Sequence, residues 1–340
     1  MGNDLSIFSP KISTVSKGIE GKLLLFHSNE RKLGKTLQAT KFPKPYYLRF
    51  EQGINAIQGL AYAPLTKWSD FKKIRKQLTN PKTLDKAKEM YTTIIVDTVD
   101  VAIKWCEKYV CNSQGVDRLN DGNSGYGLWK EYENEWFNEW NALLNAGYCI
   151  IFIAHSESKK FTDPKTGEEY EQLYPKGDKR TIDLIIDAVD FIGYVKSNGY
   201  DEEGKSLLSS IYFQSCPEYL AGSRFKYMAP EITPFTAAGV QEAITNAIVA
   251  EEEESGMEAI TYDQKFKELQ EEDENIPFED LMGNVKKLYK EMYNISKVAT
   301  REIIDKYLGE GKKLSQATEK QYEQLIMIVD EFEDYIAENS

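Results

Sequence analysis

The sequence has few of the residues that build metal and disulfide sites. Its 340 residues include four cysteines, none in a C-x-x-C pair, and only two histidines, His27 and His155. Structural zinc sites need four closely spaced cysteine and histidine ligands, so a zinc site is not expected. The scattered cysteines instead predict free thiols in a reducing cytosol.

Long hydrophobic runs are also missing. The longest, such as Leu23–Phe26 and Ile150–Ala154, are far shorter than the ~18 residues of a membrane helix. We therefore expect no association with a membrane. With 41% hydrophobic and 29% charged residues, the composition is typical of a globular protein and excludes disorder over the whole chain.

Excess negative charge is confined to one end of the chain. Residues 251–340 hold 24 acidic and 11 basic residues, a net charge of −13, whereas residues 1–250 hold 31 of each. The acidic runs 251–254 and 271–274 are typical of solvated linkers. After them, apolar residues recur at helical spacing. We predict a core at residues 1–250, an acidic linker at 251–277 and a small helical domain at 278–340.

Short apolar segments alternate with helical segments along the core. Strands are expected at 22–26, 46–50, 92–96, 148–154, 191–195 and 207–213, and helices at 99–110 and 128–146. Strands that are apolar throughout and separated by helices are typical of a parallel sheet buried on both faces. The expected fold class is α/β, a mostly parallel central sheet flanked by helices and followed by a small all-helical domain.

Five aromatic residues recur three or four positions apart in the helix expected at 128–146. This spacing places them on one face of the helix and predicts core packing, while a base-stacking surface is the alternative. They are Trp129, Tyr132, Trp136, Phe137 and Trp140.

A phosphate-loop pattern follows the first expected strand. Residues 29–36 read Asn-Glu-Arg-Lys-Leu-Gly-Lys-Thr, close to the pattern G-x-x-x-x-G-K-[ST]. In that pattern the backbone N–H groups hold phosphates, the Lys reaches the β- and γ-phosphates and the hydroxyl binds Mg²⁺. Gly34, Lys35 and Thr36 are intact. Asn29 replaces the first glycine but tolerates a left-handed backbone, and Lys32 stands where many loops carry another glycine. A Gly-Lys-Thr tripeptide also arises by chance.

Three polar residues end neighbouring strands and can complete such a site. Asp97 ends the strand at 92–96 and fits a Walker B acid that holds Mg²⁺; a cap for the following helix is the alternative. Glu51 ends the strand at 46–50 and can act as a general base on water; a solvated loop acid is the alternative. His155 ends the strand at 148–154 and can sense the γ-phosphate, or be a structural histidine.

The order of these motifs resembles the RecA-like P-loop ATPases. More closely, the order of motifs resembles that of the phage-encoded AAA/RecA-like nucleotide-binding proteins, which include single-strand annealing recombinases. The resemblance covers roughly residues 10–235 and includes Phe50-Glu51-Gln52-Gly53, Ile94-Ile95-Val96-Asp97-Thr98 and Ile153-Ala154-His155.

The resemblance implies a role for each candidate residue, with ATP and Mg²⁺ as cofactors. It implies nucleotide contacts at Asn29, Lys32, Gly34, Lys35 and Thr36, metal contacts at Thr36 and Asp97, a catalytic carboxylate at Glu51, a γ-phosphate sensor at His155, and at Arg224 a finger reaching the nucleotide of a neighbouring subunit. An arginine supplied in this way stabilises transition-state charge.

The resemblance also implies that DNA binds at loops following two of the strands, about residues 113–127 and 156–180. Cations and aromatic residues in the second loop suit a single strand. They are Lys159, Lys160, Phe161, Lys176, Lys179 and Arg180. This loop also holds six acids, which bring its net charge to zero, so a plain solvated hairpin with its turn at 163–167 is the alternative.

The expected function is therefore that of a RecA-like phage ATPase that binds single-stranded DNA and promotes annealing or recombination. It is expected to form a homo-oligomeric ring or filament, to bind a single-strand binding protein through its C-terminal region, and to work in the cytoplasm of an infected host cell. The altered loop and the net charge favour a different class, a nucleotide-gated oligomeric interaction protein with weak or no hydrolysis and no DNA role. A nucleotide or small-molecule kinase shares the loop, but no clear acceptor site or Arg-rich lid is found.

Overall fold

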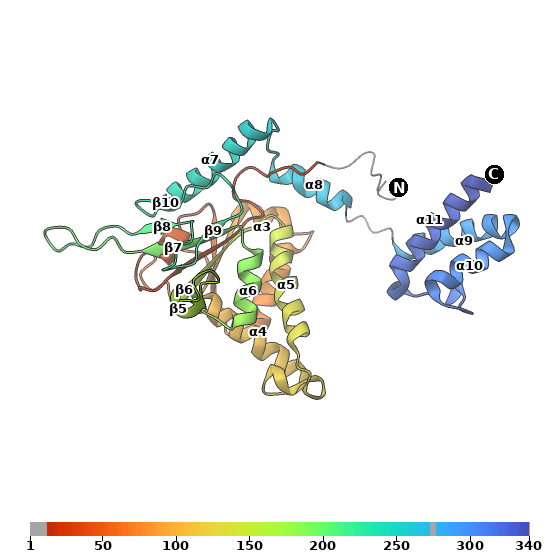
Figure 1. Cartoon of the computed structure of the whole chain (residues 1–340), viewed down its shortest axis with the longest axis horizontal. Helices are drawn as coiled ribbons and strands as arrows, with labels where there is room; N and C mark the ends of the chain where they lie inside the picture. Colours follow the sequence, from red (N-terminus) through yellow and green to blue (C-terminus); the bar gives the residue numbers. More distant parts are fainter. Residues whose placement is uncertain (1–11, 273–276, 340) are drawn as a thin grey trace. The chain divides into compact units, whose positions relative to one another are not determined.

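The computed structural model describes residues 12–272 and 277–339, which divide into two compact units (Figure 1). The division falls within helix α8 (Tyr262–Glu272), after Lys267. The first unit contains a sheet flanked by helices, and the second contains helices. The predicted fold class, a mostly parallel α/β core followed by a small helical region, is confirmed.

A ten-stranded sheet organises the first unit. Its order is β10-β8-β7-β1-β5-β4-β2-β3, with β6 paired to β5 and β9 to β7. The pairs from β7 through to β3 are parallel, whereas β6, β8, β9 and β10 pair antiparallel. The strands are β1 (Leu23–Ser28), β2 (Pro45–Arg49), β3 (Tyr62–Ala63), β4 (Thr93–Asp97), β5 (Cys149–Thr162), β6 (Glu169–Pro175), β7 (Phe191–Lys196), β8 (Ser210–Tyr212), β9 (Gly222–Ser223) and β10 (Glu231–Ile232). Because β1, β4 and β5 are parallel neighbours, their carboxyl ends lie at one edge of the sheet.

Helices cover both faces of the sheet because alternate residues of each strand point to opposite sides. Leu25 of β1 belongs to a core that includes side chains of α2, α4, α5 and α6, whereas Leu24 and Phe26 belong to a second core with α1 and α7. The helices are α1 (Lys35–Ala39), α2 (Trp68–Thr79), α3 (Leu84–Met90), α4 (Val99–Gln114), α5 (Trp129–Asn145), α6 (Lys179–Ala188) and α7 (Ala237–Ser255). Short 3₁₀ turns lie at 119–121 and 123–125.

Three of the five aromatic residues of α5 lie in the core, as predicted, whereas Trp129 and Phe137 are only half-buried. Tyr132, Trp136 and Trp140 are each at most 3% exposed. Trp136 stacks on Trp68 of α2 at 5.7 Å between ring centroids, and Trp140 stacks on Phe71 at 4.5 Å. These contacts bury the apolar face of α2, a helix that the sequence analysis did not predict.

Two segments differ from their predicted form. The acidic residues 251–254 belong to the last turns of helix α7, which ends at Ser255, and residues 262–272 form α8, so much of the expected linker is helical. The strand expected at 207–213 is limited to β8, because residues 207 and 208 are exposed and contribute nothing to the core. Apolar residues alone did not distinguish this exposed stretch from a buried strand.

The second unit packs three helices around its own core. They are α9 (Phe278–Ile295), α10 (Lys297–Leu308) and α11 (Tyr322–Asn339), with 3₁₀ turns at 314–316 and 319–321. Val285, Met292, Ile328 and Phe332 are almost fully buried between them. A capping box precedes α11, since the side chain of Gln321 accepts hydrogen bonds from both the N–H and the hydroxyl of Thr318.

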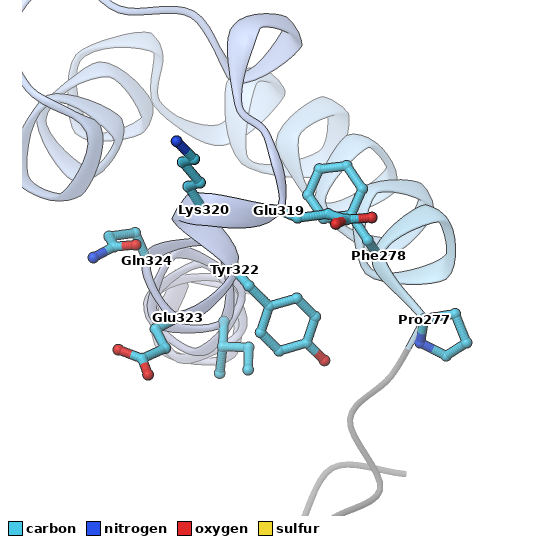
Figure 2. A pocket seen from close by; sticks show the side chains of 8 residues that line it. Pro277, Phe278, Glu319, Lys320, Tyr322, Glu323 and Gln324 are labelled. Carbon is cyan, nitrogen blue, oxygen red and sulfur yellow. The ribbon is translucent and has the colours of Figure 1, made fainter. Parts of the chain in front are cut away.

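A pocket of about 670 Å³ lies on the second unit (Figure 2). Phe278 and Tyr322 give it an apolar wall, and the carboxylates of Glu319 and Glu323 with Lys320 give it a polar one. None of the predicted nucleotide or DNA residues lines this pocket, and its two carboxylates are unsuited to phosphate. Among the helices that the structure describes, none is both long and apolar enough to span a bilayer.

Candidate nucleotide-binding site

The phosphate-loop segment leaves the carboxyl end of β1, whose six residues are all buried. Lys32 (φ 64°) and Gly34 (φ 88°) adopt left-handed backbone conformations, whereas Asn29 does not. Asn29, which would tolerate a left-handed backbone, does not need to adopt one here. A lysine in this conformation costs about 1–2 kcal/mol more than a glycine, which explains why many loops carry glycine at this position.

Lys35 begins helix α1 and is buried, at 8% exposure. Its ammonium donates a hydrogen bond to the hydroxyl of Ser28, the last residue of β1. Burial lowers the pKa of Lys35 to about 8, and the nearby charge of Asp97 offsets this only in part. The ammonium is therefore desolvated, and a phosphate anion beside it would restore the favourable charge interaction that water no longer supplies.

We expect the affinity for ATP to depend on pH through this lysine. Above about pH 8 the free protein loses the ammonium proton, so the Kd for ATP should rise about tenfold per pH unit until the pKa of the complex is reached. The measurement is the Kd of a fluorescent ATP analogue from pH 7 to 9.5. In Lys35→Arg the guanidinium does not titrate in this range, so its profile should be flat. An equal slope in that variant would contradict the assignment.

Asp97 receives hydrogen bonds from two residues distant in sequence. Its Oδ2 accepts from the hydroxyl of Thr36 at 2.7 Å and from that of Tyr47, on β2, at 2.9 Å. Burial raises the pKa of Asp97, although both hydrogen bonds act to lower it. The N-cap of α4 is Thr98, so the alternative interpretation of Asp97 as the helix cap is not supported. The loop and the strand-end acid thus meet, as their motif order predicted.

Glu51 lies at the same edge of the sheet. Its backbone N–H donates to the carbonyl of Asp97 at 2.9 Å, and its Oε2 accepts from the hydroxyl of Thr98 at 3.1 Å. The side chain is otherwise exposed. The structure therefore brings Glu51 next to Asp97 while leaving its carboxylate open to solvent.

His155 lies within β5, opposite Ser28 of β1 in the parallel register. It is half-buried, and its carbonyl accepts from the N–H of Lys176 at 2.8 Å. The position beside Ser28, the residue that holds Lys35, places His155 at the carboxyl edge with the other candidates. The strand continues beyond His155 to Thr162, so the histidine does not end it as expected.

Arg224 lies at the opposite, amino-terminal edge of the strands. Its backbone N–H donates to the carbonyl of Asp190, and its guanidinium donates to the carbonyl of Asp187 and lies 3.7 Å from the Asp190 carboxylate. Asp190 in turn accepts from the N–H of Leu23, the first residue of β1. Arg224 is therefore remote from the phosphate loop of its own chain. This position is compatible with its expected role only if it contacts the nucleotide of a neighbouring subunit.

The candidate DNA segment folds as the antiparallel hairpin β5–β6, with Thr162 paired to Glu169 across the turn. On one face Phe161 stacks on Tyr170 at 5.8 Å between ring centroids. The ammonium of Lys159 lies 4.2 Å from the centroid of the Tyr174 ring and 3.9 Å from Oε1 of Glu157, and among the described residues its buried Nζ atom has no hydrogen-bond partner. The hairpin form matches the alternative interpretation of this segment and does not by itself decide between the two.

The other predicted cations are divided between the hairpin and a helix. Lys160 is exposed on β5, and Lys176 is exposed directly after β6. Lys179 and Arg180 instead form the first turn of α6, where Arg180 lies over the ring of Trp129 at 4.5 Å. The sequence predicts a loop at these two residues, but Asp178 caps α6 by accepting from the N–H of Arg180.

Comparison with known proteins identifies the family. A family profile described as "AAA domain" matches residues 29–225, which include the phosphate loop, Asp97 and the hairpin. The chain belongs to the AAA domain family. A relative described as "SPbeta prophage-derived uncharacterized protein YorG", from Bacillus subtilis (strain 168), is 40% identical over 335 residues, covering 98% of this chain and 99% of the relative.

Two solved structures have weak likeness to this AAA domain protein. The flagellar accessory protein FlaH from Methanocaldococcus jannaschii is 12% identical, covers 60% of this chain and 88% of its own, and has a TM-score of 0.27. The RadB recombinase is 11% identical, covers 52% of this chain and 76% of its own, and has a TM-score of 0.28. At TM-scores this low, neither likeness informs the function of this chain.

The residues of this AAA domain suit a nucleotide with its Mg²⁺. A buried ammonium beside the loop matches a phosphate, and the Thr36 hydroxyl and Asp97 carboxylate are oxygen ligands of the kind that Mg²⁺ prefers. A further carboxylate oxygen, Oδ1 of Asp100, is buried without a hydrogen-bond partner among the described residues. At Gly53 a Cβ atom would lie 2.8 Å from the hydroxyl of Tyr47, so a glycine is needed beside this cluster.

Several residues that shape the site were not predicted. Ser28 holds the Lys35 ammonium and Tyr47 holds the Asp97 carboxylate. His27 is fully buried, and burial lowers its pKa to about 4, so the ring is neutral at pH 7. Its Nε2–H donates to the carbonyl of Leu220, which leaves Nδ1 to accept from the Ser156 hydroxyl at the start of the hairpin. In the sequence, the one indication of these residues was that they are polar positions within otherwise apolar strands.

Proposed function

We propose that this AAA domain protein is a Mg²⁺-dependent ATPase that binds single-stranded DNA and promotes annealing or recombination in the cytoplasm of a phage-infected or prophage-carrying cell. The observation that carries the ATPase part is the 2.7 Å hydrogen bond between Thr36 and Asp97, 61 residues apart, beside the buried ammonium of Lys35. The prophage description of the 40% identical relative supports the phage context.

In this proposal each residue at the carboxyl edge has a separate task. Lys35 neutralises phosphate charge, and Thr36 and Asp97 supply oxygen ligands to the metal. When bound, Mg²⁺ neutralises charge that develops on the transferred phosphoryl group. Glu51, exposed beside Thr98, accepts a proton from the attacking water as general base. His155, opposite Ser28 in the sheet, senses the γ-phosphate, and its strand continues into the hairpin.

The aromatic face of the β5–β6 hairpin supports the DNA part of the proposal. Aromatic rings stack with any base, so a ladder such as Phe161 on Tyr170 suits a single strand of any sequence. Lys160 and Lys176 are exposed and can contact the phosphate backbone. Lys159 is already engaged with the Tyr174 ring, so we assign it to shaping the face rather than to phosphate contact.

We further propose that the chain assembles as a ring or filament, with Arg224 of one subunit serving the nucleotide of the next. Residues up to the end of α7 would form the assembling core. The helical unit, which has its own buried core, would bind a partner such as a single-strand binding protein. Its excess of acidic residues makes it unsuited to bind DNA itself.

The test is fluorescence anisotropy of a labelled single-stranded oligonucleotide with no nucleotide, ADP or ATP·Mg²⁺, with phosphate release measured in the same samples. We expect binding that requires ATP, weakens steeply with salt and is lost in Lys35→Ala. Phe161→Ala should weaken DNA binding by about 5- to 150-fold, the effect of losing one stacked base, without changing ATP binding. Tyr293→Ala, an exposed tyrosine of the helical unit, is the matched control and should have no effect.

ATP binding without any DNA response would contradict the DNA part. It would favour the nucleotide-gated interaction protein, for which the left-handed Lys32 and the net charge of −13 are the supporting observations. Absence of ATP binding would contradict the whole proposal.

A further inference from the structure

An arm projects from the sheet beside the phosphate loop (Figure 1). The arm, residues 197–209, connects β7 to β8 and extends away from the first unit as a two-stranded ribbon (Figure 1). Its strands are joined where the N–H of Leu207 donates to the carbonyl of Gly199 and where that of Asp201 donates to the carbonyl of Lys205, both at 2.9 Å. A two-stranded ribbon alone is marginally stable in water, so packing within this chain does not account for the arm.

The arm carries both exposed apolar and acidic side chains, the acids in its turn at residues 201–203 and the leucines closer to its base. Residues 200–208 are all exposed, and among them Tyr200 is 74%, Leu207 45% and Leu208 71% exposed. The arm also carries three acids and one lysine, a net charge of −2. Exposed apolar side chains gathered on one projection are typical of a contact surface.

An apolar groove lies on the other side of the same unit. The groove has a volume of about 250 Å³ and is lined chiefly by Tyr46, Ile74, Leu78, Ala87, Met90 and Tyr91. Met90 is 54% exposed although it lines the groove. The segment that supplies most of this lining, residues 67–90, carries eight basic and three acidic residues. Three of the basic residues pair with acids outside the segment, Lys72 with Glu135, Arg75 with Glu139 and Lys88 with Asp263, which leaves an excess of two positive charges. Lys86 lines the groove itself.

We infer that the arm of one copy docks into the groove of a second copy. The arm cannot reach the groove of its own chain, because β1, β5 and β4 lie between β7 and β2 in the sheet. The acidic arm with its exposed apolar side chains matches the groove in both charge and polarity, because the groove has an apolar lining, Lys86 in its wall and an excess of positive charge in the segment that forms it. The same negative charge repels nucleic acid, which makes DNA an unsuitable occupant. This contact deepens the self-assembly included in the proposed function, and its biological meaning rests on that proposal.

A contact between two different surfaces of the same chain repeats from copy to copy. Such head-to-tail contacts close into a ring or continue as a filament. The base of the arm is also tied to the nucleotide site, since the hydroxyl of Ser209 donates to the carbonyl of Leu33 in the phosphate loop at 2.8 Å. Docking of the arm and the conformation of the loop are therefore coupled, and ATP·Mg²⁺ should strengthen association.

The first test is sedimentation velocity of the full chain over a range of concentrations with ATP·Mg²⁺. Leu208→Glu in the arm and Met90→Glu in the groove should each weaken association at least about tenfold, because each places a charge in an apolar contact. Val298→Glu, at a site 68% exposed on α10, adds the same charge elsewhere and should have no effect. All three variants should keep ATP binding and the native circular dichroism spectrum, since the altered side chains are exposed.

The second test locates the contact. Leu208→Cys and Met90→Cys variants, mixed and treated with a short bismaleimide, should cross-link to each other more than either variant does to itself. Equal cross-linking in all three samples would overturn the inference, as would association unchanged in both glutamate variants. A chain that binds ATP but remains monomeric would also overturn the inference and leave the proposed ATPase intact. Assembly through these surfaces without ATP binding would support the docking and contradict the proposed function.

Discussion

Replacing Glu51 with Gln should lower kcat for ATP hydrolysis by about 10²–10⁴-fold while ATP still binds. The amide keeps the shape of the side chain and can still accept the hydrogen bond from Thr98, 3.1 Å away in the native protein. It has no basic carboxylate to take a proton from water. Because the side chain is exposed, the substitution should leave the fold unchanged. Steady-state phosphate release and the Kd of a fluorescent ATP analogue measure the two quantities separately.

The matched control for this prediction is Glu89→Gln, an exposed carboxylate at the end of α3 on the opposite side of the unit. It should hydrolyse ATP at the native rate. A Glu51→Gln protein with native kcat would show that Glu51 is only a solvated loop acid. A parallel loss of ATP binding would instead assign Glu51 to holding the nucleotide or the metal.

Replacing Glu139 with Ala should lower the free energy of unfolding of the first unit by about 3 kcal/mol. Glu139 is 3% exposed on α5, and both its oxygens accept from Arg75 of α2, at 2.7 and 2.8 Å. Lys72 lies 3.4 Å from the same carboxylate. Removing the acid leaves two partly buried cations without this partner. Breaking a buried ion pair in this way costs about 3–5 kcal/mol of stability. We expect the lower end of this range because the Arg75 side chain is 18% exposed.

Urea unfolding monitored by tryptophan fluorescence measures this loss. All five tryptophans lie between residues 68 and 140, so the signal reports the first unit alone. The double variant Arg75→Leu with Glu139→Leu removes both charges and should recover most of the stability, because no cation is left unpaired in the pair. A Glu139→Ala protein within about 0.5 kcal/mol of the native one would show that the pair behaves as a surface salt bridge.

Local patterns in the sequence predicted the elements nearest the candidate site. The apolar strands around Leu25, Ile95 and Ile151 were recognisable because both faces of these strands are buried, so the apolar run is continuous. Gly34-Lys35-Thr36 and Asp97 were recognisable because each follows such a strand directly. Their meeting followed from the rule that parallel strands end at one edge of a sheet.

Other features depend on contacts between residues far apart in the sequence. Tyr47 looks like any core residue of β2 until its hydroxyl is seen to donate to Asp97. Helix α2 has charged residues between its apolar ones, and Glu139 and Glu135 on α5 neutralise them. The backbone is left-handed at Lys32, and not at Asn29, because of the path that the loop takes between β1 and α1. The residue types of the loop do not indicate this.

The sequence by itself determined the α/β class, the order of the motifs and the independent helical region, since each depends on periodicity or spacing within a few residues. Only the tertiary structure decided which polar groups meet at Asp97, that Arg224 lies at the edge remote from its own loop, and that residues 207 and 208 project into solvent instead of completing a strand. The physical reason is the same for all three. Burial and hydrogen-bond partners are set by which strands become neighbours in the sheet, and strand neighbours are not encoded in any short stretch of the chain.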